Sequence, residues 1–299
     1  MNLLKNLKIY KLNNMFDDKE YCLLKKRGII LIEGKDRFKL IQGIISNDIE
    51  LLRRKPSIYS SLLTPQGRFQ HDFFISNFNE KFYLECNISE KEEVAKKLMM
   101  YKLRLDIQIT IISNLNIILT KKKLNFSEIC SSEIISFYDP RFDNSFFSRT
   151  YADSNFLTEI KKKFVEINDI KYESLRLNNC IPDFSIDAIK KKSLLLEMRF
   201  DDLNGISWTK GCFMGQEITA RMKHRGTVKK LIFKVLIDFK NNLKNDITLE
   251  EKIVGQLKSH NKKDGIAFFD INALSNLNKK KFFSGDSKLT IQKPWWVKY

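Results

Sequence analysis

The sequence predicts an α+β fold followed by a small β-barrel. Up to residue 226, pairs of apolar strands alternate with single helices, an order typical of ferredoxin-like sandwiches. After that residue, short apolar strands are separated by Asn, Lys and Gly turns, which is typical of a barrel. With 43% hydrophobic residues, the 299-residue chain has ample material for packed cores. We expect an N-terminal extension over 1–20, an α+β region over 21–226 and a β-barrel over 227–299.

The individual elements follow from apolar periodicity and from turn residues. Gly34-Lys35-Asp36 ends a strand and starts a short helix, and Pro65-Gln66-Gly67 joins two apolar strands into a hairpin. Residues 137–151 are expected to form an irregular link. The expected strands are 28–33, 58–63, 69–74, 81–86, 107–112, 115–119, 228–239, 252–260, 265–271 and 288–299, and the expected helices are a short one around 38–41, 89–105, one from 168 to before Pro182, and 216–225.

The chain is strongly basic, with 53 Lys and Arg against 36 Asp and Glu and a net charge of +17. Such a field attracts nucleic acid, anionic lipid or a polyanionic cofactor. The lysine runs are scattered, however, so charge alone leaves direct nucleic-acid binding as an open alternative. No apolar run reaches the roughly 18 residues that span a bilayer, so we expect no membrane insertion. The first sixteen residues lack arginine and a cleavage-site pattern, so we expect a cytoplasmic protein.

The cysteines indicate a reducing compartment. Their number is odd and their spacing is wide, which is against a disulfide framework. The three histidines have no spacing typical of a zinc site. Three cysteines among apolar neighbours are expected to be small buried hydrophobes. These are Cys22, Cys86 and Cys130, while Cys180 and Cys212 complete the set.

Cys212 has a different setting. It lies between Gly211 and Phe213, two residues after Lys210 and just before the helix expected over 216–225. A nearby cation and a helix N-terminus both favour thiolate, so we expect a reactive or metal-binding sulfur. The alternative is a tight turn with a packed cysteine.

The helix after Cys212 has two further features. Glu217 and Arg221 have the spacing of an i,i+4 ion pair, and Gly226 suits a left-handed C-cap. His224 is too far along the helix to act as base for Cys212, so a hydrolase is not indicated.

The segment "KGCFMGQEITAR" resembles the signature of the YgfZ family, folate-binding proteins related to the glycine cleavage T-protein. The resemblance extends from about residue 21 to the C-terminus. It includes the segments "GIILIEGKDRFKLIQGIISNDI", "LLTPQGRFQHDFFI", "YDPR", "YESLRLNNCIP", "LNGISWTKGC" and "IVGQLKS".

This resemblance implies two interleaved ferredoxin-like subdomains and a barrel around a channel that binds tetrahydrofolate. It also implies a role in assembly or repair of iron–sulfur clusters in particular enzymes, including those that thiolate tRNA, together with carrier or client protein partners. Cys212 and Lys210 would be the catalytic residues, and Cys212 would also ligate a transient cluster shared with a partner. The implied folate-binding residues are Asn47, Asp72, Arg176 and Trp208, and the signature loop contributes Gly211, Gly215, Gln216, Glu217 and Arg221.

The chain departs from the family pattern at three positions. His71 replaces one carboxylate of a T-protein aspartate pair, which leaves Asp72 to anchor the pterin rather than to transfer protons. Cys180 stands where the family has glycine, and Arg199 where asparagine is common.

Two other functions remain open, and so does the question whether the protein is an enzyme. One is a folate-dependent aminomethyltransferase. The other is a basic tRNA-binding module with Trp295 and Trp296 as stacking platforms, although these two are expected in the barrel core or at its rim.

Overall fold

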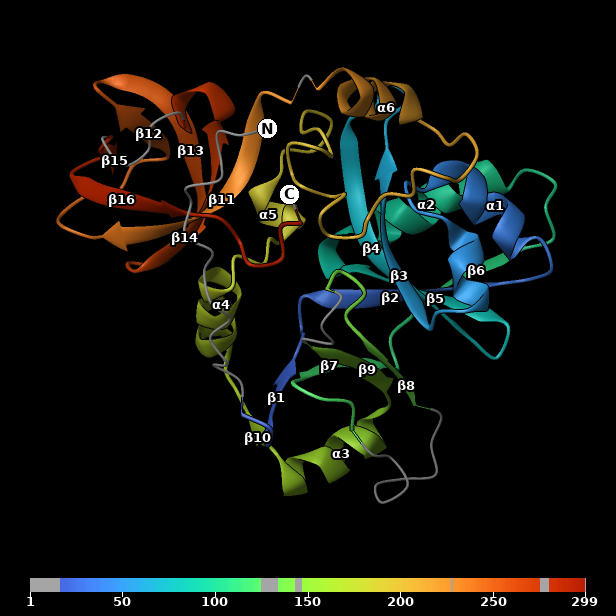
Figure 1. Ribbon diagram of the computed structural model, residues 1–299. Helices are drawn as coiled ribbons and strands as arrows, with labels where there is room; N and C mark the ends of the chain where they lie inside the picture. Colours follow the sequence, from blue (N-terminus) through green and yellow to red (C-terminus); the bar gives the residue numbers. More distant parts are fainter. Residues whose placement is uncertain (1–16, 125–133, 143–146, 227, 275–279, 299) are drawn as a thin grey trace.

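Three β-sheets organise the protein (Figure 1). The computed structural model describes residues 17–124, 134–142, 147–226, 228–274 and 280–298. The first sheet has the order β3 (Ser57–Leu63), β4 (Phe69–Phe78), β5 (Lys81–Asn87), β2 (Arg27–Glu33), β6 (Gln108–Ile112). The second has the order β10 (Val165–Glu166), β1 (Glu20–Leu23), β7 (Asn116–Thr120), β9 (Ser148–Ala152), β8 (Ile135–Tyr138).

The two open sheets are interleaved along the chain. Strand β1 pairs with β7 and β10 in the second sheet, whereas β2, only a few residues later, lies in the first sheet. The helices are α1 (Arg37–Ile44), α2 (Lys91–Lys102), α3 (Ser154–Lys163), α4 (Asp169–Asn178), α5 (Phe184–Asp187) and α6 (Gln216–Arg225), with short 3-10 turns at Ile49–Arg53, Ile88–Glu90 and Ile271–Leu274.

The first sheet separates two hydrophobic cores, because successive side chains of a strand point to opposite faces. Ile30 and Phe73 pack with the core residues of α1 and α2. Ile29 and Phe74 belong to the large central core, which also contains residues of the second sheet and α4. On β4, this alternation turns His71 toward α2 and Asp72 toward the second sheet.

The C-terminal residues form a closed barrel, as the sequence predicts. Its strands are β11 (Lys230–Asp238), β14 (Asp264–Asp270), β13 (Lys252–His260), β12 (Asp246–Leu249), β15 (Phe282–Ser284) and β16 (Ser287–Gln292), in that order around the barrel. The barrel has its own apolar core. The predicted α+β arrangement with a C-terminal barrel is thus confirmed.

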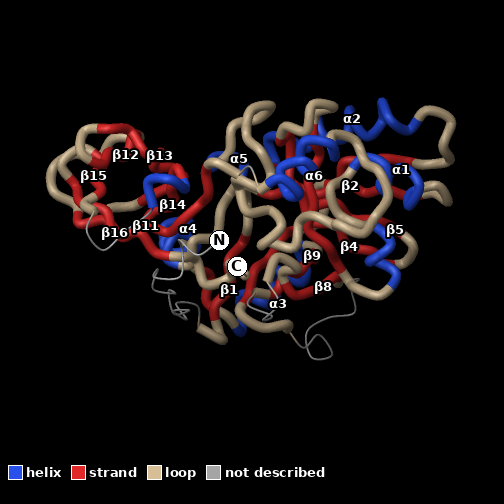
Figure 2. Tube along the Cα trace, turned by 45° about the horizontal axis from the view of Figure 1, so that its top comes forward, coloured by secondary structure: helices blue, strands red, loops and turns tan. Residues whose placement is uncertain are grey.

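The two C-terminal tryptophans lie outside the core of the barrel, so of the two places expected for them, barrel core or rim, the core is wrong. The chain leaves the barrel after β16, and its C-terminus lies between the barrel and the open sheets (Figure 2). Trp296 is buried in the central core, where its Nε1 donates to the carbonyl of Cys180 at 3.1 Å. The ring of Trp295 lies 5.1 Å from that of Phe142. These contacts fasten the C-terminal tail to the α+β region.

Some expected elements differ from the structure. The irregular link expected over 137–151 contains half of β8 and most of β9, so that prediction is wrong. The helix expected over 89–105 is shorter, because α2 begins only after a 3-10 turn and ends at Lys102. The segment 1–16 of the expected extension and Cys130 lie outside the described residues. In the described ranges, no helix is long and apolar enough to cross a membrane.

Candidate functional site

The signature loop ends in the helix that the sequence predicts. Gly215 has a φ of +79° directly before α6, and Gly226 has a φ of +60° directly after it. The amide of Gly226 donates to the carbonyl of Met222, which closes the helix in the expected left-handed C-cap. The predicted ion pair is also present, with Arg221 Nη2 at 2.8 Å from Glu217 Oε1 on the exposed face.

The loop is packed against the hairpin turn through two glycines. A Cβ on Gly215 would lie 2.4 Å from the carbonyl oxygen of Thr64, and a Cβ on Gly67 would lie 2.7 Å from the carbonyl oxygen of Gly215. Gln216 fixes the loop from inside, since its Oε1 accepts from the amide of Phe213 at 3.2 Å. Two segments far apart in sequence therefore form one rigid support.

We expect Gly215→Ala to lower the free energy of unfolding by about 2 kcal/mol or more, because it combines a left-handed φ with a backbone clash. Gly211→Ala is the matched control. No atom lies within 4 Å of a Cβ at Gly211, so the expected change is within about 0.5 kcal/mol. Urea unfolding of both variants measures the difference, and equal stabilities would contradict this packing.

Lys210 anchors the loop. Its ammonium binds backbone carbonyls instead of acting beside the sulfur of Cys212, where the sequence led us to expect it. Its buried Nζ donates to the carbonyl oxygens of Gln42, Ile45 and Asn47 at 2.7, 2.8 and 2.8 Å. Burial lowers the pKa of Lys210 to about 8, while the three carbonyls take up the three protons of the charged form. The ammonium therefore binds the C-terminal end of α1 and the segment that follows it.

Cys212 is exposed, unlike the other described cysteines. Burial raises the pKa of each of the thiols of Cys22, Cys86 and Cys180 to about 12. Within the part of the chain that the structure describes, no group of three His, Cys, Asp or Glu residues is arranged to hold a metal ion. Cys212 is thus an accessible thiol on a firmly packed loop, and among the described residues it is not part of a complete metal-binding group.

A cleft of about 730 Å³ opens between the two sheets and the segment before the signature loop. Two of the predicted folate-binding residues, Asn47 and Trp208, line it. The Nδ2 of Asn47 donates to the carbonyls of Tyr59 and Asn204, both at 2.8 Å. Trp208 is exposed, with Lys223 Nζ 5.2 Å from the centre of its ring.

Asp72 lies in a recess next to this cleft. Tyr59 lines the cleft, and its hydroxyl donates to Asp72 Oδ2 at 2.8 Å. The other oxygen of Asp72 accepts no hydrogen bond from the described residues. The side chain stays half-buried, yet burial raises the pKa of this carboxyl, with Arg27 acting in the opposite direction. A carboxyl with spare hydrogen-bonding capacity in such a recess can bind a polar ring edge.

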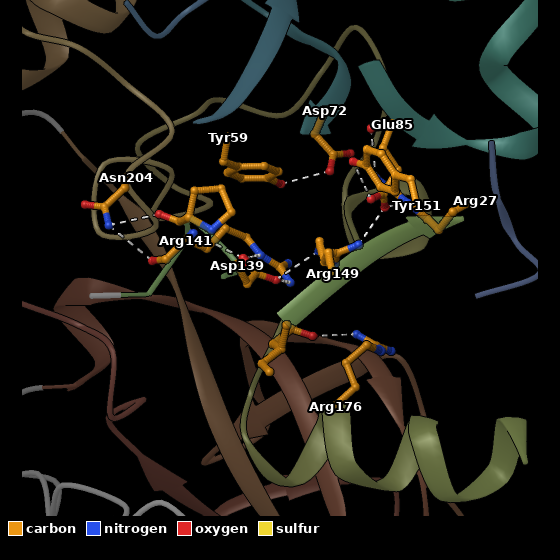
Figure 3. A network of polar contacts seen from close by, with 12 residues as sticks. Arg27, Tyr59, Asp72, Glu85, Asp139, Arg141, Arg149, Tyr151, Arg176 and Asn204 are labelled. Atoms are coloured by element: carbon orange, nitrogen blue, oxygen red, sulfur yellow. Dashed lines mark hydrogen bonds and ion pairs between the residues drawn. The ribbon is translucent and has the colours of Figure 1, made fainter. Parts of the chain in front are cut away.

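Beside Asp72 lies a buried ionic network that the sequence reasoning missed (Figure 3). Glu85 of β5 is its fully buried centre. Arg27 Nε and Arg149 Nη1 donate to Glu85 Oε1 at 2.7 and 2.6 Å, and Tyr151 Oη donates to Oε2 at 3.1 Å. Burial alone would raise the pKa of Glu85, but Arg149 and Arg27 hold it below its usual value.

The same network includes the Asp-Pro-Arg residues of the segment "YDPR". Asp139 is fully buried and accepts from Arg141 at 3.0 and 2.8 Å and from Arg149 at 3.2 Å. Burial alone would raise the pKa of Asp139, but Arg141 and Arg149 lower it to about 2. The network joins the first sheet to the second, and this motif was the one sequence signal that could have revealed it.

Arg176 is placed away from the cleft lining. It is buried on α4, where Nη1 donates to Asp187 Oδ2 at 3.0 Å and to the carbonyl of Ile181 at 2.9 Å, and it also pairs with Glu173. Its contacts fasten α4 to α5. Of the residues predicted from the resemblance, the structure therefore brings Asn47, Trp208 and, through Tyr59, Asp72 to one cleft, and Arg176 is not among them.

The three departures from the family pattern have structural explanations. His71 is buried under α2, with Nδ1 2.7 Å from Glu90 Oε2, so it faces away from Asp72 and the cleft. Cys180 and Arg199 have φ values of +53° and +55°. Glycine and asparagine adopt this left-handed region more readily than other residues, which accounts for the family's usual choices.

The chain has relatives in sequence and in fold among known proteins. No protein-family model matches the chain. Over 220 residues it is 26% identical to the mitochondrial iron–sulfur cluster assembly factor IBA57 homolog of Mycosarcoma maydis, covering 69% of this chain and 54% of that protein. It is 28% identical over 272 residues to the Dictyostelium discoideum IBA57 homolog, covering 79% and 66%. It is 26% identical over 230 residues to the tRNA-modifying protein YgfZ of Hamiltonella defensa, covering 71% and 68%.

Among solved structures, the glycine cleavage system aminomethyltransferase T of Bartonella henselae has the same fold, with a TM-score of 0.78 and 11% identity over 95% of this chain and 87% of that one. The chain spans about half the length of the fungal relatives it matches. The prediction of a cytoplasmic location is wrong, since the IBA57 relatives are named as mitochondrial proteins.

Proposed function

We propose that this chain, which is similar to YgfZ and IBA57 proteins and has the T-protein fold, assists the assembly or repair of iron–sulfur clusters. The observation that carries the proposal is the exposed thiol of Cys212 on a loop held by Gly215, Gln216 and buried Lys210. A rigid, accessible thiolate can ligate an iron of a cluster during its transfer.

The cluster is the cargo and is bound only in part by this chain. Each iron takes more thiolate ligands than Cys212 alone can offer, and the described residues include no further ligand group. A carrier or client protein would supply the remaining ligands. We propose a mitochondrial location, which the names of the IBA57 relatives support, and clients that include tRNA-thiolating enzymes, in line with the YgfZ relative that is named a tRNA-modifying protein.

We further propose that the cleft binds a reduced folate. Asp72 would accept a hydrogen bond from the pterin edge, and the exposed Trp208 offers an aromatic face. Lys55, Lys223 and Lys298 line the same cleft and suit the carboxylates of a glutamate tail. When bound, the folate would supply one-carbon chemistry or a conformational signal, while the chain's residues orient it.

Neither alternative function has support of this kind. Trp296 is buried, so it offers no face on which a base could stack. For an aminomethyltransferase, this chain offers only one carboxylate of the expected pair, Asp72, because His71 faces α2.

The test of the main proposal is rescue of an iron–sulfur enzyme in cells that lack their own IBA57 protein. We expect this chain to restore the activity of that enzyme. Absence of rescue by a well-expressed, folded chain that has been directed to the same compartment would contradict the proposal.

Tetrahydrofolate binding tests the cleft separately. We expect Asp72→Asn to weaken binding about tenfold, which corresponds to about 1.4 kcal/mol, while the bond from Tyr59 and the fold remain. Glu80→Gln, on an exposed turn, is the control. A triglutamyl folate should bind more tightly than the monoglutamate at low salt, with a smaller gain at 0.2 M salt, because ions screen exposed charges. Equal affinities of wild type and Asp72→Asn would exclude this use of the recess.

A further inference from the structure

Helix α2 ends in an exposed apolar surface. Met99, Met100 and Leu103 are 52%, 66% and 86% exposed. Met99 and Met100 lie in the last turn of α2, which ends at Lys102, and Leu103 is the residue directly after it. The three exposed side chains therefore lie at the same end of the helix, and they are here called the methionine face. The opposite side of α2 is already covered, because Val94 and Leu98 pack in a hydrophobic core. Adjacent exposed large apolar residues of this kind mark a surface that another molecule covers.

The methionine face is connected to the cysteine loop. Between its residues, Tyr101 donates through its hydroxyl to the sulfur of Met214 at 3.3 Å. Met214 is two residues after Cys212, and its amide donates to the carbonyl of Gly43 at 3.1 Å, which fixes the loop beside α1. In Figure 1, α1 and α2 lie on the same side of the molecule, below α6. Space at Gly211 is open, so nothing within 4 Å would block an approach there.

Basic side chains surround this surface. Lys96, Lys102 and Arg104 have no carboxylate partner among the described residues. The acidic residues of α2, Glu92 and Glu93, are in its first turn, at the opposite end from the methionine face. The electrostatic complement of an apolar surface with a basic border is an acidic protein with an apolar projection.

We propose that the methionine face is the docking surface for an acidic protein that carries the iron–sulfur cluster on its own cysteines. This inference rests on the proposed function of Cys212, whose missing co-ligands the docked carrier would bring within reach. A second copy of this chain would bind this surface poorly, because the basic residues around the two methionine faces would repel each other. Methionine side chains are flexible and polarisable, so one surface can accept a carrier in both its loaded and empty forms.

The test compares variants in the iron–sulfur enzyme rescue assay. We expect the triple change Met99→Ser, Met100→Ser and Leu103→Ser to lower rescue at least tenfold, and Lys96→Glu with Arg104→Glu to do the same. The matched control is Ile170→Ser with Ile253→Ser, two exposed apolar residues on α4 and β13, and it should keep full rescue. Thermal unfolding and the alkylation rate of Cys212 should be unchanged in every variant.

A photo-reactive benzoyl-phenylalanine at position 103 identifies the occupant. We expect crosslinks to an acidic protein with cluster-binding cysteines, and loss of these crosslinks when the two basic residues are reversed. Crosslinks to a second copy of this chain or to lipid would overturn the proposal, as would full rescue by the triple variant while Cys212→Ala is inactive. If both the triple variant and Cys212→Ala rescue fully, the proposed function itself has failed.

Discussion

Replacing Arg149 by methionine is expected to lower the free energy of unfolding by about 3–5 kcal/mol. Arg149 connects two fully buried carboxylates, Glu85 at 2.6 Å and Asp139 at 3.2 Å. Methionine fills part of the space but leaves both carboxylates short of a positive partner. Each carboxylate keeps one arginine, Arg27 beside Glu85 and Arg141 beside Asp139, but loses the second positive charge that offsets its desolvation, so the loss is large.

Urea unfolding measures this loss, and Arg53→Met is the control. Arg53 forms an exposed pair with Glu50, for which a change below about 1 kcal/mol is expected. The wild type should also lose stability in acid. Since Arg141 and Arg149 lower the pKa of Asp139 to about 2, its contribution is complete above about pH 4 and is lost as the pH falls toward 2. If the Arg149→Met variant is as stable as wild type, the ion pairs of Arg149 do not form in solution.

Cys212→Ala should abolish rescue of an iron–sulfur enzyme and leave stability within about 0.5 kcal/mol of wild type. The side chain is exposed, so its loss leaves no cavity, and Gly215 and Lys210 hold the loop without it. The loss of rescue would then be due to the missing thiol alone.

Two further measurements make this result specific. Arg225→Ala, an exposed change on α6 outside the cleft, should keep rescue. An alkylating probe at pH 7 should label Cys212 before Cys22, Cys86 and Cys180, which are buried. If Cys212 is alkylated more slowly than the other three cysteines, or if the alanine variant rescues fully, the loop has a purely structural role.

The sequence predicted what is encoded locally. Helix α6 begins and ends at the expected residues, because Gly215 and Gly226 each determine a left-handed turn within a few residues of chain. The hairpin of β3 and β4 was predictable for the same reason, since its turn residues separate two strongly apolar strands.

What depends on distant residues was not predictable. Strand β9 is fully buried but contains Ser148, Arg149 and Thr150, so it lacks an apolar pattern. Its arginine is tolerated only because Glu85 lies opposite in the folded protein. Lys210 was expected to activate the sulfur, because its sequence neighbour is Cys212, whereas its ammonium reaches carbonyls more than 160 residues away along the chain.

The interleaving of the two open sheets has a consequence for synthesis on the ribosome. Strand β1 is made well before its partners, since β7 (Asn116–Thr120) and β10 (Val165–Glu166) follow β1 (Glu20–Leu23) much later in the chain. The first sheet can close as soon as β6 has emerged, whereas β1 must wait with unpaired backbone groups until Glu166 has left the exit tunnel. Such long-range pairing is slow, and it leaves a strand edge open to wrong partners. We therefore expect the nascent chain to need chaperone protection of β1 until its second sheet is complete.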